Sequence, residues 1–273
     1  MELLFKLLNC RRINLSLAAF PGYGHFHSMQ EATALRERSA LVEPLWGELS
    51  LDHVQVVPQN HGVFGVEEAA RMRNLYPNTN FRLHANVWVA DRRAIYDLSS
   101  FLEFQDWFRT AGKVQAELGG ICYSAHAGYR DNCRLEQMFD NARRAADLFD
   151  CPVAIEGLYP DRHKKQLLAT WPEYRKLLDS GLPFALDLSH LNIVAKYSRE
   201  FQRSLVIDLL SSPSCLEIHV SSNDGYGDQH QVCQSNAKPW WFDLLSHANP
   251  NAVIFTEGNL RRHIGASATQ VGQ

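Results

Sequence analysis

The sequence lacks the features that mark several common classes of protein. None of its apolar runs reaches the roughly 18 residues that a membrane-spanning helix requires. Its six cysteines form no C-x-x-C pair, which argues against redox motifs and cysteine-ligated metal sites. The formal net charge of −3 gives no basic excess of the kind that binds nucleic acids generally. We therefore expect neither a membrane protein nor a general polyanion-binding protein.

The sequence also lacks a dinucleotide-binding motif and the features of a signal peptide. The first predicted strand is not followed by G-x-G-x-x-G, so the sequence gives no support for a dinucleotide site. In the opening segment the arginines follow the short apolar run, and no A-x-A site comes after it, unlike a signal peptide. The scattered cysteines are typical of reduced thiols. We expect a cytoplasmic protein.

What the chain does contain is a regular alternation of short apolar runs and longer amphipathic stretches. Stretches such as CRLEQMFDNARRAADLFD repeat apolar residues at helical spacing. Alternation of this kind, without a flexible linker, predicts a single-domain α/β protein, a (β/α)₈ TIM barrel over residues 13–260, with a disordered tail at 264–273. The eight predicted strands are Ile13–Phe20, His53–Pro58, Phe81–Trp88, Gly120–Ala127, Pro152–Leu158, Pro183–Leu191, Cys215–Ser221 and Ala252–Glu257.

Polar side chains stand at the ends of six consecutive predicted strands, where a TIM barrel carries its active site. All are imidazoles or carboxylates, which bind Zn²⁺, Mn²⁺ or iron. Because four carboxylates and five histidines exceed the needs of one ion, two or three metal ions are expected. The nine predicted ligands are His84, His126, Glu156, Asp187, His190, His219, Asp228, His230 and Glu257.

A structural role competes with the metal hypothesis for each residue taken singly, since a lone histidine at a strand end is more often a hydrogen-bonded core residue. His84 is the most open to that interpretation, and Asp228 and His230 lie in a loop that the strand pattern does not place. Further residues near the predicted mouth are candidate substrate contacts. These are Asn86, Tyr129, Arg130, Asn192, Asn223, His25 and His61.

Three motifs carry a resemblance to a known family. They are the Asp-x-x-His at Asp187 and His190, His219 followed by Asp228-x-His230, and the terminal Glu257. In these motifs the chain resembles the xylose-isomerase-like TIM-barrel superfamily, which includes endonuclease IV, sugar isomerases and epimerases, and multinuclear non-haem iron-dependent oxidative enzymes of the methanobactin-biosynthesis type. The full set of nine resembles the trinuclear members.

The resemblance to each branch has its own departures. Sugar isomerases use a smaller ligand set, corresponding to Glu156, Asp187, His219 and Glu257. Endonuclease IV has a glycine-rich segment where this chain has QVCQSNAKPWW, and no DNA-grasping basic loops are evident, so a nucleic-acid partner is not expected. The oxidative enzymes share the proline and tryptophan after Asp-x-His and a stretch like WPEYRKLLDSGLPFALDLSHLNI, but commonly have asparagine at the position of His190.

The resemblance therefore implies, first, a di- or tri-iron, O₂-dependent oxidative enzyme. Its substrate would be a peptide or a small molecule, with a thiol as a candidate reacting group and a recruiting partner protein if it is a peptide. Glu156 would be a bridging ligand, with Glu257 and His126 as further catalytic residues. Iron is the favoured metal, although zinc and manganese suit the same ligands.

Other functions stay open. In a metal-dependent sugar isomerase or epimerase, the metal would polarise a carbonyl while Glu156 or Glu257 moves a proton. In a trinuclear zinc phosphodiesterase of the endonuclease IV type, a bridging hydroxide would attack phosphorus. A barrel that binds metal without catalysis is the remaining hypothesis.

Overall fold

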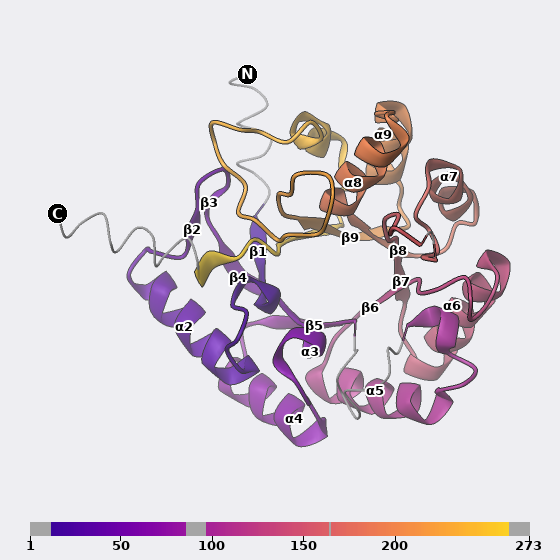
Figure 1. The fold of residues 1–273 in the computed structure, drawn as a ribbon. Coiled ribbons are helices and arrows are strands. Elements are labelled where there is room, and N and C mark those ends of the chain that lie inside the picture. Colours follow the sequence, from indigo (N-terminus) through magenta and orange to yellow (C-terminus); the bar gives the residue numbers. More distant parts are fainter. Residues whose placement is uncertain (1–11, 86–96, 164, 262–273) are drawn as a thin grey trace.

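The computed structural model describes residues 12–85, 97–163 and 165–261. Eight parallel strands close into one barrel in the order β1-β10-β9-β8-β7-β6-β5-β4, with helices around the outside (Figure 1). Pairing of β1 with both β10 and β4 closes the ring. The predicted single-domain (β/α)₈ barrel is thus confirmed; the predicted tail at 264–273 lies outside the described residues.

The eight barrel strands are β1 (Ile13–Ser16), β4 (Ser50–Val56), β5 (Asn80–His84), β6 (Tyr123–His126), β7 (Val153–Glu156), β8 (Phe184–Asp187), β9 (Cys215–Val220) and β10 (Val253–Thr256). The α-helices are α2 (His25–Glu37), α3 (Pro58–His61), α4 (Val66–Leu75), α5 (Gln105–Leu118), α6 (Leu135–Phe149), α7 (Trp171–Asp179), α8 (Leu188–Ser198) and α9 (Arg203–Ser211). The described residues also form the 3₁₀ helices η1 (Leu17–Ala19), η2 (Leu98–Ser100) and η3 (Phe242–His247), and β2 (Val42–Glu43) pairs with β3 (Gly47–Glu48) in a small hairpin.

The helices cover the barrel because each presents an apolar face to it. Phe108 of α5, Leu177 of α7 and Leu209 of α9 are all fully buried in the main hydrophobic core. The strands are short and buried on both faces, as expected for a parallel sheet lined by helices. Burial of this interface fixes the strand ends, and therefore fixes the residues that follow them.

All eight predicted strands end one to four residues earlier in the structure, and at two of them a side-chain cap is the cause. The Ser16 side chain accepts a hydrogen bond from the backbone N–H of Ala18, which turns the chain into η1 instead of continuing β1 to Phe20. Asp187 caps α8, so β8 ends there and His190 lies in the first turn of a helix, not on the strand. Between β9 and β10 the described chain forms η3 and loops.

Within the described part of the chain, no helix combines the length and the apolar character needed to cross a bilayer. The cysteines at 122, 133, 151, 215 and 233 are all unpaired, in agreement with their prediction as free thiols.

Candidate metal centre

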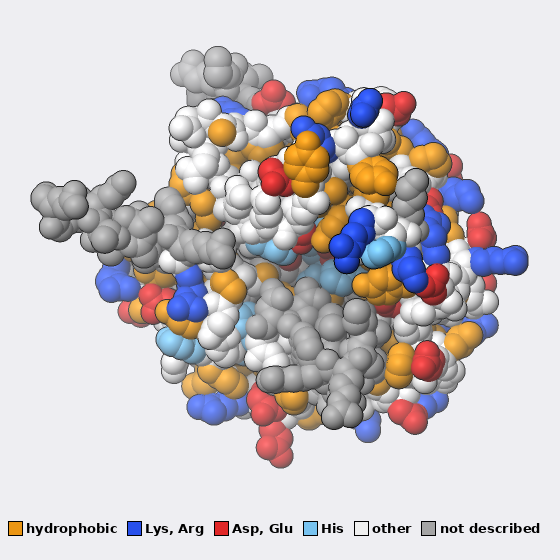
Figure 2. Space-filling view, in the orientation of Figure 1, with side chains coloured by type: hydrophobic (Ala, Val, Ile, Leu, Met, Phe, Trp, Pro, Cys, Tyr) orange, Lys and Arg blue, Asp and Glu red, His pale blue; other side chains and the backbone are white. Residues whose placement is uncertain are grey.

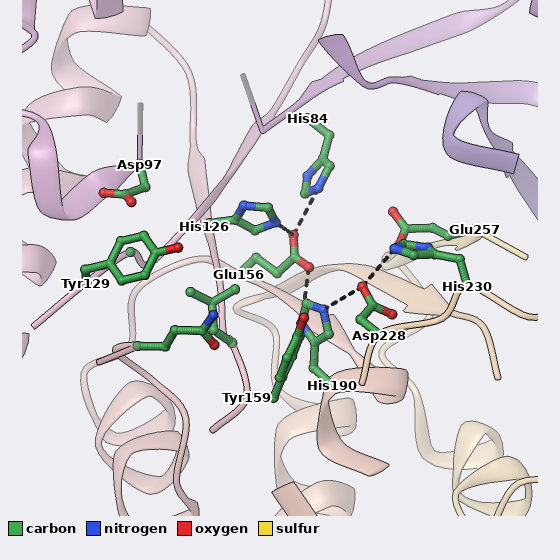
Figure 3. Close-up of a pocket in the computed structure, with 13 residues that line it drawn as sticks. His84, Asp97, His126, Tyr129, Glu156, Tyr159, His190, Asp228, His230 and Glu257 are labelled. Carbon is green, nitrogen blue, oxygen red and sulfur yellow. Dashed lines mark hydrogen bonds and ion pairs between the residues drawn. The ribbon is translucent and has the colours of Figure 1, made fainter. Parts of the chain in front are cut away.

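A pocket of about 230 Å³ opens at the carboxyl ends of the strands and is lined by seven of the nine predicted ligands. Histidine side chains are visible in the hollow near the middle of this face (Figure 2). Three of the labelled residues, His84, His126 and His190, point toward Glu156, while Asp228, His230 and Glu257 stand beside them (Figure 3). Asp187 and His219 are buried in contact with this group. All nine predicted ligands therefore converge at one site.

Glu156, the last residue of β7, lies at the centre of this cluster and is almost fully buried. Its carboxylate oxygens lie 3.1 Å from His84 Nε2 and 3.6 Å each from His126 Nε2, His190 Nδ1 and His219 Nδ1. Burial acts to raise the pKa of Glu156, but the surrounding imidazoles outweigh it and hold the pKa well below its usual range. The carboxylate is therefore ionised and shared among four imidazoles.

The turn from β8 into α8 positions Asp187 and His190. Asp187 Oδ1 accepts hydrogen bonds from the backbone N–H groups of Ser189 and His190, at 2.6 and 2.9 Å. This capping orients the carboxylate, and the buried Oδ2 has no hydrogen-bond partner among the described residues. His190 Nε2 lies 3.5 Å from Asp187 Oδ2 and 3.4 Å from Asp228 Oδ2. One helix N-terminus thus delivers two potential ligands to the same point.

The loop after β9 supplies Asp228 and His230, and β10 leads into Glu257. His230 Nε2 lies 2.7 Å from Asp228 Oδ2, and its Nδ1 lies 3.6 Å from Glu257 Oε2. The backbone of His230 has a φ of +45°, a left-handed conformation that costs about 1 kcal/mol or more in a non-glycine residue. Burial raises the pKa of Glu257 to about 7. Strain and carboxylate burial at one place are typical of a functional site.

The donor set fits a bound cation. Among the nine predicted ligands, four buried atoms have no hydrogen-bond partner in the described part of the chain, and they are Glu156 Oε2, Asp187 Oδ2, His219 Nδ1 and His230 Nδ1. Three groups place their ligand atoms within 4.8 Å of one another: His84 with His126 and Glu156, His84 with His219 and Glu257, and Glu156 with Asp187 and His190. Buried polar atoms left unpaired are costly, and metal ions would satisfy these.

Only some of the residues predicted to contact substrate line the pocket. Tyr129 lines the pocket, as expected. Arg130 forms an ion pair with Glu173 at 2.7 Å, and Asn192 donates to Asn223 Oδ1 at 2.8 Å. These polar groups are thus engaged in neighbouring contacts and do not belong to the pocket lining. Asn86 lies outside the described residues.

The two remaining predicted contacts, His25 and His61, pack beside each other next to Phe64, away from the pocket lining. Both ring nitrogens of His61 contact backbone oxygens, those of Tyr23 and Leu17. His25 is buried, and its Nε2 has no hydrogen-bond partner in the part of the chain that the structure describes. Burial, and secondarily the nearby His61, lower the pKa of His25 to about 3.

Replacing His25 with leucine should make stability less sensitive to acid. Because the folded pKa lies below the unfolded value of 6.5, the unfolded chain binds a proton first as the pH falls. This group then costs the wild type about 2 kcal/mol of unfolding free energy between pH 7.5 and pH 5.0, and the variant escapes that loss. Urea unfolding at both pH values measures it. Exposed His247→Gln is the control, and an equal pH dependence in H25L and wild type would refute the assignment.

Three polar pocket residues were not anticipated from the sequence: Asp97, Tyr159 and Gln166. Asp97 Oδ2 and Gln166 Oε1 are buried acceptors without a hydrogen-bond partner among the described residues. Burial raises the pKa of Asp97 to about 6. A Cβ at Gly128, where φ is +92°, would lie 2.2 Å from Asp97 Oδ1, so only glycine fits there. No strand-end pattern marks these residues, because they come from loops whose paths the sequence does not reveal.

Comparison with known proteins shows that the fold of this chain is similar to that of several solved structures. No protein-family model matches the chain, and no curated protein matches it. Among solved structures, it is similar to a D-tagatose 3-epimerase-like protein, with 15% identity, a TM-score of 0.61, and coverage of 95% of this chain and 99% of the other.

Two further solved structures are similar to the chain, an AP endonuclease and a second epimerase. An AP endonuclease, family 2, from Brucella melitensis has 15% identity and a TM-score of 0.64, covering 91% of this chain and 93% of the other. A D-allulose 3-epimerase from Methylomonas sp. has 14% identity and a TM-score of 0.60, covering 90% and 84%. At such identities the likeness concerns the barrel fold, which this chain shares with sugar epimerases and AP endonucleases.

Proposed function

We propose that this protein is a metal-dependent enzyme that isomerises or epimerises a small hydroxylated carbonyl compound, such as a sugar or a related polyol derivative. The observation that carries the proposal is the placement of two buried carboxylates, Glu156 and Glu257, in the wall of one small pocket among other imidazole and carboxylate side chains. The likeness to sugar epimerases supports it.

The proposed chemistry divides between a metal and the chain. Glu156, Asp187, His219 and Glu257 would hold the ion, which when bound polarises a substrate carbonyl. The chain's own task is to remove a proton from the carbon beside that carbonyl and return it. Glu156 and Glu257, both buried in the pocket wall, are the carboxylates that would accept and return that proton.

The pocket favours a small polar substrate over a peptide or a duplex. Its volume of about 230 Å³ suits a ligand of few heavy atoms. The wall beyond the metal-ligand residues carries Tyr129, Tyr159 and Asp97 (Figure 3). Gln166 also lines it, and both Asp97 Oδ2 and Gln166 Oε1 are acceptors without partners among the described residues. Acceptors without partners would receive hydrogen bonds from substrate hydroxyl groups.

The deciding experiment loads the purified protein separately with Mn²⁺, Zn²⁺ and Fe²⁺ and incubates it with a panel of ketoses and aldoses in D₂O. Deuterium incorporation at the carbon beside the carbonyl, followed by NMR, is the expected result, together with a new epimer or isomer. An absence of exchange with every metal and every sugar would refute the proposal.

A second candidate is a multinuclear hydrolase, favoured by the ligand-type residues that a single-metal isomerase does not need, His126 and His230 among them. Three zinc ions would then bind a phosphodiester and activate water. The AP endonuclease likeness supports this candidate. Metal content per chain separates the two, since one ion favours the isomerase and three favour the hydrolase.

Substitution of His126 or His230 by glutamine discriminates the same candidates by activity. A single-metal isomerase should keep its rate within about tenfold, because neither residue belongs to its ligand set. A multinuclear enzyme should lose at least about a hundredfold, since each substitution empties one metal position. The experiment measures the turnover rate of wild type and of each variant on a sugar and on a DNA duplex with an abasic site.

The iron-dependent oxidative function rests on the sequence resemblance, and neither the epimerases nor the AP endonuclease above adds support to it. A peptide substrate and a recruiting partner protein belong to that hypothesis. Two or three irons per chain after anaerobic purification, with O₂ consumption in the presence of thiol compounds, would restore it to first place.

A further inference from the structure

A second polar layer lies inside the barrel, and three of its four strands, β5, β6 and β9, also carry proposed metal ligands. It consists of Gln55 on β4, Arg82 on β5, Ser124 on β6 and Glu217 on β9, all buried. We call these four residues the inner network. Glu217 is its hub, because Oε1 pairs with Arg82 Nη1 at 3.0 Å and Oε2 accepts from Ser124 Oγ at 3.0 Å. The proposed function leaves this fully buried carboxylate without a role.

The hub contacts one proposed ligand directly. Glu217 and His219 are two residues apart on β9, so their side chains lie on the same side of the strand. Glu217 Oε2 is 3.2 Å from His219 Nε2, whereas His219 Nδ1 faces Glu156 and Glu257 at 3.6 and 3.8 Å. An ionised carboxylate only accepts hydrogen bonds, so a neutral His219, the form that binds a metal ion, carries its hydrogen on Nε2 and its lone pair on Nδ1.

Gln55 Nε2 lies 2.9 Å from His219 Nε2 and 3.3 Å from Glu217 Oε2. With the hydrogen on His219 Nε2, the Gln55 amide must be turned over so that Oε1, which has no hydrogen-bond partner among the described residues, accepts it. A neutral amide could compete for the Nε2 position by donating to it. Hydrogen bonds to a charged group are the stronger kind, so Glu217 and not Gln55 decides where the imidazole hydrogen sits.

The hub reaches a second proposed ligand through Ser124. A serine hydroxyl has one hydrogen, and at Ser124 it is directed to Glu217. His84 Nδ1 lies 2.8 Å from the same Oγ, so at that contact the imidazole must be the donor. His84 therefore carries its hydrogen on Nδ1 and presents the lone pair of Nε2 to the pocket, 3.1 Å from Glu156 Oε2.

We propose that Glu217 is a positioning residue that sets the tautomers of two metal ligands at once, His219 directly and His84 through Ser124. Each imidazole is thereby presented to the metal by a different nitrogen, Nδ1 for His219 and Nε2 for His84. A carboxylate behind a metal-bound histidine fixes ring orientation and raises ligand basicity. This proposal rests on the metal centre of the proposed function but not on the reaction that it catalyses.

The hydrogen position on His84 also gives a reason for a cation to bind between His84 and Glu156. With hydrogen on Nδ1 of His84, two acceptors face each other at 3.1 Å, the Nε2 lone pair and the Glu156 carboxylate. Such a contact is unfavourable unless a cation or a proton lies between them, and ligand bonds of about 2.0–2.2 Å span such a gap. The inner network therefore prepares the site for metal.

The test compares wild type, Glu217→Gln and Ser124→Ala, with Asn14→Ala as a matched control in a buried polar residue of β1 whose contacts lie outside the network. Zinc affinity is measured by competition with a chelator, and imidazole ¹⁵N chemical shifts report which nitrogen carries hydrogen. We expect E217Q to bind zinc about 10- to 100-fold more weakly and S124A about tenfold more weakly, with N14A unchanged. The ¹⁵N signals of His84 should change in both network variants, and those of His219 in E217Q.

Wild-type affinity and unchanged imidazole shifts in folded E217Q and S124A would overturn the proposal, as would an equal loss of affinity in N14A. If E217Q does not fold, S124A decides alone, because it keeps the Arg82–Glu217 pair. The hydrogen on His84 Nδ1 is observable in metal-free protein too, so the tautomer test gives a result even if the wild type binds no zinc. A wild type that binds zinc but never exchanges sugar protons would refute the isomerase and leave the role of Glu217 intact.

Discussion

Replacing Glu156 with glutamine should abolish metal binding and lower turnover at least a thousandfold, equivalent to about 4 kcal/mol of transition-state stabilisation. The carboxylate stands within 3.6 Å of four imidazoles and belongs to two of the three potential ligand groups. An amide carries no charge to hold a cation. Its NH₂ group would also compete for the imidazole lone pairs.

Elemental analysis of the purified variant and deuterium exchange into substrate are the two measurements. Glu173→Gln is the matched control, since Glu173 is a largely buried carboxylate paired with Arg130 and outside the pocket lining. We expect that control to retain metal and activity. Full metal content in E156Q would show that Glu156 is not a ligand, and full activity would remove it from the mechanism.

Metal removal should lower the melting temperature by about ten degrees. A ligand at a thousand times its Kd stabilises the folded state by about 4.1 kcal/mol, and each kcal/mol shifts the Tm by about 2–4 °C in chains of 150–250 residues. The physical source is the group of buried atoms without hydrogen-bond partners among the described residues, which a cation satisfies only in the folded protein.

Thermal unfolding of chelator-treated protein, with and without added zinc, gives the shift. The E156Q variant serves as the control, because its melting temperature should not respond to zinc. An identical Tm for wild type in zinc and in chelator would mean that these residues form a self-sufficient polar network, held by ion pairs such as His230 with Asp228 at 2.7 Å.

The architecture was largely predictable from the sequence. Periodic apolar runs identify strands and helices because burial of one face dictates which positions must be apolar. The carboxyl ends of parallel strands meet at one face of a barrel, and this rule alone predicts that residues such as His126, Glu156 and Glu257 lie together. Strand ends were less predictable, as Ser16 and Asp187 show, because a single capping hydrogen bond shifts a boundary by several residues.

Substrate contacts were the least predictable feature of the site. His25, Arg130, Asn192 and Asn223 lie close to strand ends in the sequence, yet their side chains are engaged elsewhere. Asp97 and Gln166 line the pocket with no sequence signal. Loop paths depend on contacts between segments far apart in the chain, and these leave no local pattern.

The sequence by itself determined a closed barrel and a convergence of imidazoles and carboxylates at its mouth, because strand periodicity and strand-end position are local properties. Only the tertiary structure decided which atom of each group faces the others. The link from His84 to Ser124 depends on the register between β5 and β6, and the contact of Ser124 with Glu217 joins β6 to β9 across the barrel. Register across a barrel is set by packing of the whole sheet, and this is why the chemistry of the site could be listed from the sequence but its proton positions could not.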